Sequence, residues 1–301
     1  MSGASSLYRT LENVKGVTCR QGVPLSSLTS FGVGGPVAVL AVAENTEGLR
    51  NVLRSIADSG TKWFMLGAGT NVIFHDDGFD GVVLRLGSAF ANTERDGSNV
   101  RVGASALLSD TLSFCAEHSL SGLERLAGIP GSVGGAVAGN AGAYGATIGE
   151  KVQSLRGFGE RGAARRLESG DVHFDYRYAD FGPPIVLTEV ELSLEEGKRE
   201  AIVAEMEEIV KRRRERQPYE FPCAGSVFKN PPEMKAARLI EQAGLKGRKV
   251  GGAQVSDKHA NFIVNRGGAS SSDVLSLIDI VREEVQSRFS VSLQLEIKVV
   301  Q

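Results

Sequence analysis

The sequence predicts an α+β fold made of two or three compact domains. Its 301 residues are enough for several separate hydrophobic cores. A hydrophobic content of 42% with 23% charged residues is typical of a globular protein. The first third of the chain alternates apolar runs of strand length with amphipathic helical segments, and two glycine-rich clusters stand out from the rest.

The first third begins with a buried strand over 37–42 and an amphipathic helix over 46–59. Apolar residues recur in that helix at i, i+3, i+4 and i+7, which is the helical period. Asn45 or Thr46 can cap its start, and Gly60 can end it. Further strands are predicted over 63–66 and 82–86.

The rest of the chain continues with mixed elements and ends in a strand. The predicted strands cover 100–103, 152–158, 164–168, 185–194, 253–255, 262–264 and 293–300. The predicted helices cover 107–117, 199–216, 234–243 and 272–289, and Ser271 or Ser272 caps the last of them. Gln217-Pro218 breaks the helix that precedes it and marks a domain boundary.

Charge and cysteine content exclude several classes of function. A formal charge of −2 predicts no general attraction to nucleic acid or to an anionic membrane. The N-terminus lacks the apolar core of a signal peptide, and the longest apolar stretch, near 36–43, is too short to span a bilayer. Cys19, Cys115 and Cys223 are odd in number and far apart, so neither a disulfide framework nor a zinc site is predicted. We expect a cytoplasmic monomer without a metal.

The segment Gly128–Gly149 contains eight glycines and no charged side chain, which predicts a ligand-binding backbone. A glycine-rich backbone can come close to a ligand and direct several N–H groups at an anion. Without Lys or Arg, a phosphate here would be held by amides. The alternative is a set of tight turns packed between small side chains, although ordinary turns need fewer glycines.

A second glycine cluster, Gly67-Ala-Gly-Thr-Asn71, lies between two apolar runs. The pattern predicts strand, tight polar turn and strand. Many hairpins share it, so the turn alone is weak evidence for a binding site. Together with Gly128–Gly149 it indicates one long ligand held from two sides, and a dinucleotide has that shape.

Two further patterns match known motifs but lack the context that the motifs require, and the histidines match no motif. Gly157–Gly162 matches G-x-G-x-x-G, yet it contains Glu160 and is predicted to be a hairpin turn rather than a dinucleotide site. Ser226-Val-Phe-Lys229 matches S-x-x-K, but Asn230-Pro-Pro232 forbids the helix that this motif needs. The four histidines form no ligand cluster: His75 and His118 are expected on the surface or in loops, His173 is left open, and His259 could face a cleft.

Several motifs together resemble the UDP-N-acetylenolpyruvoylglucosamine reductase (MurB) family of bacterial cell-wall synthesis. They follow one another in the order of that family along nearly the whole chain. The glycine motifs alone resemble the wider group of two-part FAD-binding domains, and the later motifs narrow the resemblance. The motifs are Gly67–Asn71, Gly128–Gly135, Asn140–Gly145, Phe174–Tyr178, Gly225–Pro231, His259–Asn265 and Leu295–Lys298.

The resemblance implies a two-lobed FAD-binding domain of the vanillyl-alcohol-oxidase type and a smaller α+β substrate-binding domain. The expected bounds are 1–87 and 88–217 for the two lobes and 218–301 for the substrate domain, and the final strand could return to the lobes. NADPH would reduce a non-covalently bound FAD. The enolpyruvyl sugar nucleotide would then take a hydride from flavin N5 and a proton, which gives UDP-N-acetylmuramate for peptidoglycan synthesis.

The same resemblance implies site residues. The catalytic set would be Arg177, Ser226 and Glu296, with Ser226 as the proton donor. Substrate contacts would come from Tyr176, Arg177, Lys229, Asn230 and His259. FAD would be bound by Gly67, Ala68, Gly69, Thr70, Asn71, Ile129, Pro130, Gly131, Ser132, Gly134, Gly135, Asn140, Ala141 and Gly142.

The chemistry suits these residue types, although each has a simpler alternative. Arg177 can hold a carboxylate through a forked pair of hydrogen bonds, or it forms a surface ion pair. Ser226 can protonate a carbanion if Lys229 stabilises the alkoxide, or its hydroxyl bonds to a turn. Glu296 could be ionised, protonated by burial, or simply solvent-facing.

One departure from the family pattern concerns the segment after Arg177. Longer members carry an inserted loop there, whose tyrosine closes over the substrate. This chain reaches the next predicted strand within eight residues and resembles the shorter type. Two other functions stay open on the sequence: another FAD-linked oxidase or dehydrogenase of the same cofactor fold, and a non-catalytic nucleotide-binding module.

Overall fold

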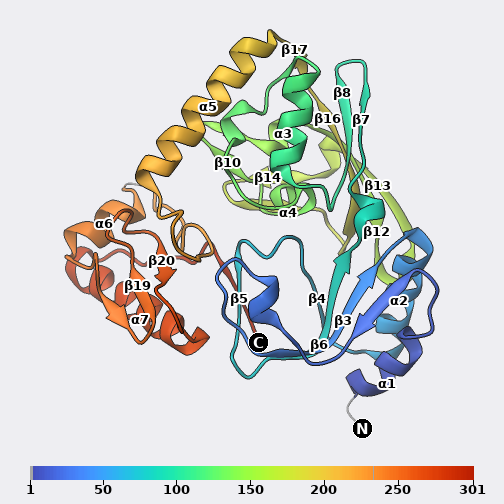
Figure 1. Cartoon of the computed structure of the whole chain (residues 1–301), viewed down its shortest axis with the longest axis horizontal. Helices are drawn as coiled ribbons and strands as arrows, with labels where there is room; N and C mark the ends of the chain where they lie inside the picture. The colour runs from blue at the N-terminus through green and yellow to red at the C-terminus, as the bar shows by residue number, and fades with distance from the viewer. Residues whose placement is uncertain (1–2, 233) are drawn as a thin grey trace. The chain divides into compact units, whose positions relative to one another are not determined.

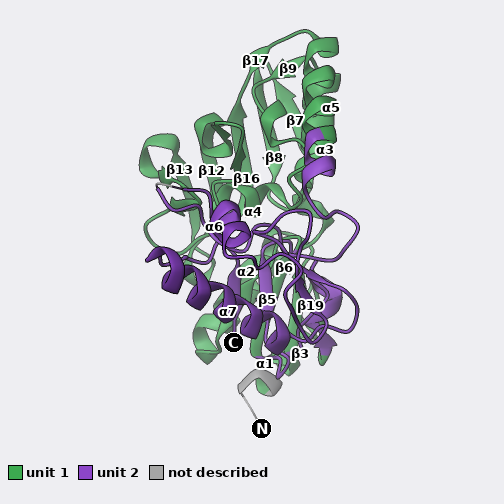
Figure 2. Cartoon of the chain, turned by 90° about the vertical axis from the view of Figure 1, so that its left-hand side faces the viewer, with its two compact units in different colours: residues 1–22, 38–68, 80–211 green, residues 23–37, 69–79, 212–301 purple. Residues whose placement is uncertain are grey.

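The computed structural model describes residues 3–232 and 234–301 (Figure 1). The chain divides into two compact units, and each is built from several separate stretches of sequence (Figure 2). Unit 1 comprises Met1–Gly22, Ala38–Ala68 and Asp80–Lys211, and unit 2 comprises Val23–Val37, Gly69–Phe79 and Arg212–Gln301.

The first sheet of unit 1 has the strand order β1-β3-β6-β4. Its strands are β1 (Val17–Arg20), β3 (Pro36–Ala43), β6 (Phe79–Leu86) and β4 (Trp63–Met65). Strands β1 and β3 are antiparallel, whereas β4 runs parallel to β6. Helices α1 (Gly3–Leu11) and α2 (Thr46–Ser59) contribute Leu11, Leu49 and Val52 to the core over this sheet.

Helix α2 begins and ends where the sequence predicts. The Asn45 side chain accepts a hydrogen bond from the Gly48 N–H at 2.8 Å, which satisfies one donor of the first turn. Gly60 ends the helix in the left-handed conformation, with φ of 62°. Of the two possible caps, Asn45 and Thr46, the structure therefore identifies Asn45.

The second sheet of unit 1 has the order β13-β12-β16-β8-β7. Its strands are β13 (Ala164–Glu168), β12 (Val152–Phe158), β16 (Val186–Ser193), β8 (Asn99–Gly103) and β7 (Thr93–Asp96). Helices α3 (Leu108–Glu117) and α4 (Val133–Ala138) share one core cluster with it, including Leu112, Val137 and Val190. The segment 157–162 comprises the end of β12 and the turn that leads to β13, which confirms that it is no dinucleotide motif.

Shorter elements complete unit 1. Its small strand pairs are β10 (Gly142–Ala143) with β11 (Ala146–Thr147), β14 (His173–Asp175) with β15 (Tyr178–Asp180), and β17 (Glu195–Glu196) with β9 (Leu120–Ser121). Helix α5 (Arg199–Arg216) matches its predicted bounds and continues past Lys211 into the stretch assigned to unit 2.

Unit 2 combines a three-stranded sheet, two helices and a parallel strand pair. The sheet is β18 (Lys249–Val250), β19 (Ala253–Val255) and β20 (Ile263–Asn265), and the helices are α6 (Ala236–Gln242) and α7 (Ser271–Phe289). Strand β5 (Val72–Phe74) pairs in parallel with β21 (Lys298–Val300), and β2 (Val23–Pro24) pairs with the first residues of β3. Phe31, Val33 and Ile73 are buried in the same core cluster as α7.

Several predicted bounds in unit 2 need correction. The strand predicted over 293–300 is only β21, because its first half makes just an isolated bridge between Leu295 and Phe228. The predicted helix 234–243 is α6, and the strand 262–264 shifts by one residue to β20. Helix α7 is capped by Ser270 rather than Ser271 or Ser272, since Ser270 and Asp273 form a reciprocal capping box.

Candidate functional site

The two glycine segments meet within unit 1. A Cβ atom added at Gly67 would lie 2.6 Å from the Ser132 Oγ atom, so a larger residue there would force this hydroxyl to move. The same hydroxyl caps α4 by accepting the Gly135 N–H at 3.3 Å. The turn that follows β4 therefore lies against the start of α4. This places the two glycine segments side by side, which is the arrangement that a ligand bound between them needs.

Backbone donors at this meeting point fit an anionic ligand. Ser132 is buried, with 5% of its surface exposed. Within residues 3–232 and 234–301, the N–H groups of Gly131 and Ser132 donate to no acceptor of the protein. A buried N–H group without a partner is costly, and a phosphate oxygen would satisfy it.

Part of the glycine content serves packing within the protein. A Cβ atom at Gly134 would lie 2.9 Å from the Ala104 Cβ atom, and one at Gly142 would lie 2.7 Å from the Ala146 oxygen. At Gly149 the added atom would meet the Phe174 ring at 2.7 Å. These three glycines are therefore required for packing within the protein, although Gly134 lies in helix α4 and Gly149 packs against a phenylalanine ring rather than in turns between small side chains.

Asn140 connects the glycine-rich segment to the hairpin β14–β15. It is 4% exposed, its Nδ2 donates to the Asp175 oxygen at 2.9 Å, and its Oδ1 accepts the Gly149 N–H at 3.0 Å. Both ends of the carboxamide are therefore engaged inside the protein. The structure gives this predicted cofactor residue a positioning role for the hairpin, which leaves only its backbone for a ligand.

Arg177 lies at the tip of that hairpin, in a backbone conformation that L-residues rarely adopt. Tyr176 and Arg177 form the two-residue turn between the paired residues Asp175 and Tyr178, and the φ angle of Arg177 is 54°. Such a residue costs about 1–3 kcal/mol, and strain of this kind concentrates at functional sites. The guanidinium carbon lies 5.3 Å from the centroid of the Tyr176 ring, so an aromatic face orients the cation.

In unit 2, hydrogen bonds bring together three segments that are far apart in the sequence. The Asn71 Nδ2 donates to the Glu296 oxygen at 3.2 Å, and the Lys298 N–H donates to the Asn71 oxygen at 3.0 Å. The Glu296 N–H in turn donates to the Val227 oxygen at 2.8 Å. The second glycine cluster, the final segment and the residue after Ser226 therefore form one connected group.

The segment that follows Ser226 forms no helix, as the proline block predicts; it bends at Val227 and makes an isolated bridge at Phe228. Besides the bond to Glu296, the Lys229 N–H donates to the Gln294 oxygen at 2.9 Å. Asn230 ends the segment, and its Oδ1 accepts the Ala236 N–H at 3.0 Å, which caps α6. The predicted substrate residue Asn230 thus also fixes the start of a helix.

His259 lies on the loop between β19 and β20, half-buried against Phe262. The two ring centroids are 4.9 Å apart in an edge-to-face arrangement. Burial lowers the pKa of His259, and the charges of Lys246 and Lys235 lower it further. The His259 Nδ1 atom accepts the Asn261 N–H at 3.3 Å, which requires an unprotonated Nδ1.

Sequence reasoning missed Asn261, although a signal was present. Asn261 interrupts the apolar run 260–264 and is only 4% exposed, so its carboxamide must find partners inside the protein. Those partners are the N–H and the carbonyl of Phe228, at 3.0 and 2.8 Å.

The predicted site residues fall into two groups. Tyr176, Arg177 and the glycine-rich segment belong to unit 1, whereas Ser226, Lys229, Asn230, His259 and Glu296 belong to unit 2. The cluster Gly67–Asn71 spans both units in the sequence, because unit 2 resumes at Gly69. Strands β4 and β5, which flank this cluster, pair in different sheets and form no hairpin.

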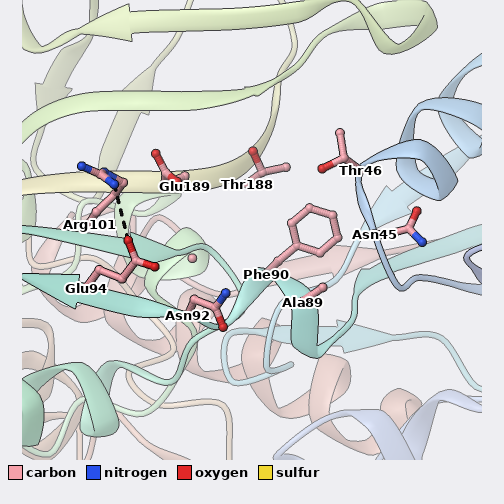
Figure 3. A pocket seen from close by; sticks show the side chains of 10 residues that line it. Asn45, Thr46, Ala89, Phe90, Asn92, Glu94, Arg101, Thr188 and Glu189 are labelled. Atoms are coloured by element: carbon pink, nitrogen blue, oxygen red, sulfur yellow. Dashed lines mark hydrogen bonds and ion pairs between the residues drawn. The ribbon is translucent and has the colours of Figure 1, made fainter.

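A separate pocket of about 270 Å³ opens in unit 1 (Figure 3). Its lining is polar and includes the ion pair between Arg101 and Glu94, at 3.5 Å. None of its residues is a predicted site residue. The lining residues are Asn45, Thr46, Ala89, Phe90, Asn92, Glu94, Arg101, Gly103, Thr188 and Glu189.

Searches for two other kinds of site give no candidate in the described part of the chain. Across residues 3–232 and 234–301, no group of three or more His, Cys, Asp or Glu side chains could hold a metal ion. Among the same residues, no helix combines the length and the apolar character needed to cross a bilayer.

Comparisons with known proteins support the cofactor site and the C-terminal motifs separately. Residues 36–167 match the family model described as an FAD binding domain. Residues 217–300 match the model described as the C-terminal domain of UDP-N-acetylenolpyruvoylglucosamine reductase. These matches confirm the predicted α+β fold with an FAD-binding domain.

Similar proteins extend the likeness over nearly the whole chain. UDP-N-acetylenolpyruvoylglucosamine reductase 1 of Bacillus cereus is 40% identical over 279 residues, which covers 92% of this chain and 93% of the relative. The reductase of Heliobacterium modesticaldum is 41% identical, with coverage of 92% and 89%. The crystal structure of the reductase from Thermus caldophilus aligns with a TM-score of 0.84 at 36% identity, covering 95% of this chain and all of the other. The chain therefore belongs to the UDP-N-acetylenolpyruvoylglucosamine reductase family of FAD-dependent oxidoreductases.

Proposed function

We propose that this protein reduces UDP-N-acetylenolpyruvoylglucosamine to UDP-N-acetylmuramate in peptidoglycan precursor synthesis, with NADPH as the reductant and Ser226 as the proton donor. The observation that carries the proposal is the connected group of unit 2. There Glu296 is hydrogen-bonded both to Val227, the neighbour of Ser226, and to Asn71 of the glycine cluster. A candidate acid, a candidate carboxylate and a cofactor-binding turn are thus held in one framework.

FAD fits the donors of unit 1. The N–H groups of Gly131 and Ser132 would hold its pyrophosphate, and Gly67 would allow the turn after β4 to approach the same place. The chemistry that FAD supplies when bound is hydride transfer, and the protein contributes orientation and charge control. Binding is non-covalent.

Arg177 binds the carboxylate of the enolpyruvyl group. Hydride addition to the double bond leaves negative charge on the adjacent carbon and on this carboxylate. A guanidinium fork fixed in a strained turn is preorganised for that charge, and preorganised charge stabilises a transition state without reorganisation. The ring of Tyr176, stacked under the guanidinium, keeps the fork from turning away.

Ser226 then delivers its hydroxyl proton to the carbanion-like carbon. A serine is a weak acid, but a carbanion is a strong base, and the Lys229 ammonium lowers the cost of the alkoxide. Glu296 completes the set beside Ser226, and Lys229 with Asn230 and His259 contacts the sugar nucleotide. The protein works in the cytoplasm as a monomer, where its three free cysteines remain reduced.

The test separates the two halves of the reaction. Purified protein should show the visible spectrum of FAD, and NADPH should bleach it. Ser226→Ala should leave bleaching unchanged, because that step needs no proton donor at position 226. Recovery of colour on addition of the enolpyruvyl sugar nucleotide should slow beyond the roughly 10²–10⁴-fold usual for general acid catalysis.

Other outcomes identify the competing functions. Colour recovery at the native rate in Ser226→Ala would remove Ser226 from the reaction. A protein that is bleached but does not respond to the sugar nucleotide would be another FAD-linked oxidase or dehydrogenase. A protein that takes up no FAD would be a nucleotide-binding module without this activity.

A further inference from the structure

The segment that follows Ser226 is held on one side by the buried residue Asn261, through both its side chain and its backbone. Asn261 binds Phe228 twice, because its Oδ1 accepts the Phe228 N–H at 3.0 Å and its Nδ2 donates to the Phe228 oxygen at 2.8 Å. Its own carbonyl accepts the Val227 N–H at 2.9 Å. On the opposite side, the Val227 oxygen and the Lys229 N–H pair with the segment 294–296.

The orientation of the Asn261 carboxamide is fixed by its partners. The Phe228 N–H needs an acceptor and the Phe228 oxygen needs a donor, so exchanging Oδ1 and Nδ2 would break both bonds. Asn261 is 4% exposed and Phe228 is 1% exposed, so water cannot replace either bond without entering the core of unit 2. The hold on this peptide is therefore both specific and costly to remove.

Position 226 is the first residue outside this bonded segment. Its hydroxyl is placed by the peptide plane that joins it to Val227. The Val227 N–H in that plane donates to the Asn261 backbone carbonyl, and the Asn261 carboxamide holds Phe228, the next residue along the chain. A displacement of about 1 Å at a reacting group can cost about 10²-fold in rate. The Asn261 carboxamide, which holds the peptide two residues after Ser226, can thus influence the delivery of the proton through the position of this segment.

We propose that Asn261 is a positioning residue, whose carboxamide holds the Phe228 peptide so that the Ser226 hydroxyl is aimed at the carbon to be protonated. The proposal rests on the proposed function, because it acts through Ser226. It predicts a defect confined to the step that consumes the enolpyruvyl sugar nucleotide. The rate at which NADPH alone bleaches the bound FAD, and the FAD content, should not change.

The decisive variant is Asn261→Asp. A carboxylate still accepts the Phe228 N–H, but it cannot donate to the Phe228 oxygen and repels it instead. We expect colour recovery with the sugar nucleotide to slow by about 10- to 100-fold at neutral pH. Deuterium exchange, measured on the peptide that contains Val227 and Phe228, should become faster, which is a readout independent of turnover.

The matched control is Asn265→Asp in the neighbouring strand. Asn265 also accepts backbone N–H groups through Oδ1, those of Gly267 and Ala269, and donates through Nδ2 to a phenylalanine carbonyl, that of Phe31 at 3.2 Å. The same chemical change there should leave both steps near the native rate. Equal slowing in the two variants would overturn the positioning role.

Acidic pH provides a rescue that a general loss of structure would not give. A protonated carboxyl at position 261 has one donor and one acceptor, like the native carboxamide. The ratio of the colour-recovery rate of Asn261→Asp to that of the native protein, measured at the same pH, should therefore rise toward unity as pH falls. The ratio removes the effects of the neighbouring titratable groups, which both proteins share. These groups are His259 on the same loop and Lys229 and Glu296 on the segments packed against it.

The remaining outcomes also decide the question. If Asn261→Asp slows NADPH consumption equally, the residue is only structural and the proposal is wrong. If Asn261→Asp binds no FAD, Asn261→Ser is measured instead, since it removes the carboxamide without placing a charge in the core. If the sugar nucleotide restores no colour even in the native protein, the proposed function is wrong. If the native protein and Asn261→Asp recover colour at the same rate, only this inference is wrong.

Discussion

Replacing Gly67 with alanine tests whether the two glycine segments depend on each other. The new Cβ atom would lie 2.6 Å from the Ser132 Oγ atom, which is closer than such atoms can approach. The hydroxyl can rotate away, but it then loses the Gly135 N–H that it accepts at the start of α4. We expect Gly67→Ala to destabilise unit 1 by the loss of this cap.

The magnitude follows from the contact that is lost. Loss of a serine cap costs about 0.5–2 kcal/mol, and typically about 1 kcal/mol. In a Ser132→Ala background the nearest remaining atom is the residue 132 Cβ, 3.8 Å from the added methyl group, which is an ordinary contact. The double variant should therefore be no less stable than Ser132→Ala alone.

The assay is thermal unfolding of the FAD-free protein for the four members of this cycle, followed by fluorescence titration with FAD. About 1 kcal/mol should lower Tm by roughly 2–4 °C in a domain of 150–250 residues. Additive losses in the double variant would refute the reasoning, because they would show that Gly67 and Ser132 act independently. FAD affinity should fall in both single variants, since each disturbs the Ser132 backbone.

Three further predictions use other parts of the chain. Arg177→Lys keeps the charge and the strained turn but loses the fork, so kcat/KM should fall by an amount equal to about 2–4 kcal/mol with normal FAD content. Burial opposes ionisation of Asp76, but N–H and hydroxyl donors at the start of α7 outweigh this effect and lower the pKa of Asp76. The stabilisation by the Asp76 carboxylate should be full at neutral pH and should be lost as pH falls through that lowered pKa. The Tm difference between the native protein and Asp76→Ala should therefore shrink in acid, and a constant difference would contradict this. Burial raises the pKa of Cys115 to about 12 and that of Cys19 to about 11. Because the thiolate is the reactive form, iodoacetamide should label both cysteines slowly at pH 8 until urea unfolds the protein. Rapid labelling of the folded protein would contradict these raised pKa values.

Local signals allowed much of the fold to be predicted. The helical period and the residues Asn45 and Gly60 gave α2 its bounds, and Pro218 gave α5 its end. The error at α7 was avoidable, because among three consecutive serines only Ser270 has an acidic residue three positions later, at Asp273. Such rules depend on residues within one turn of each other, which a sequence displays directly.

For the site, the sequence allowed candidate residues to be predicted, but not the contacts that hold them in place. The glycine segments were predicted from composition and spacing, whereas Ser226 was predicted from the resemblance of its motif to the family. The pairing of Val227 with Glu296, and the role of Asn261, depend on contacts between distant stretches, for which the sequence has no local pattern. The division of the chain into 1–87, 88–217 and 218–301 stays a prediction.

The interleaved course of the chain has a consequence for how the protein is made. Phe31 and Ile73 belong to the core of unit 2, yet most of that unit is encoded after residue 211. A fragment that starts at residue 212 would lack these side chains and also β5, the partner of β21. We expect such a fragment to be unable to fold alone.

During synthesis the same layout imposes a delay. At about 5–20 residues per second, the ribosome needs roughly 10–40 s to proceed from Phe79 to the end of β21. For that time the apolar side chains near Phe31 and Ile73 have no permanent partners, and the nascent chain is open to aggregation. Completion of unit 2 must therefore be a late, post-translational event, whose rate is set by closure of very long loops.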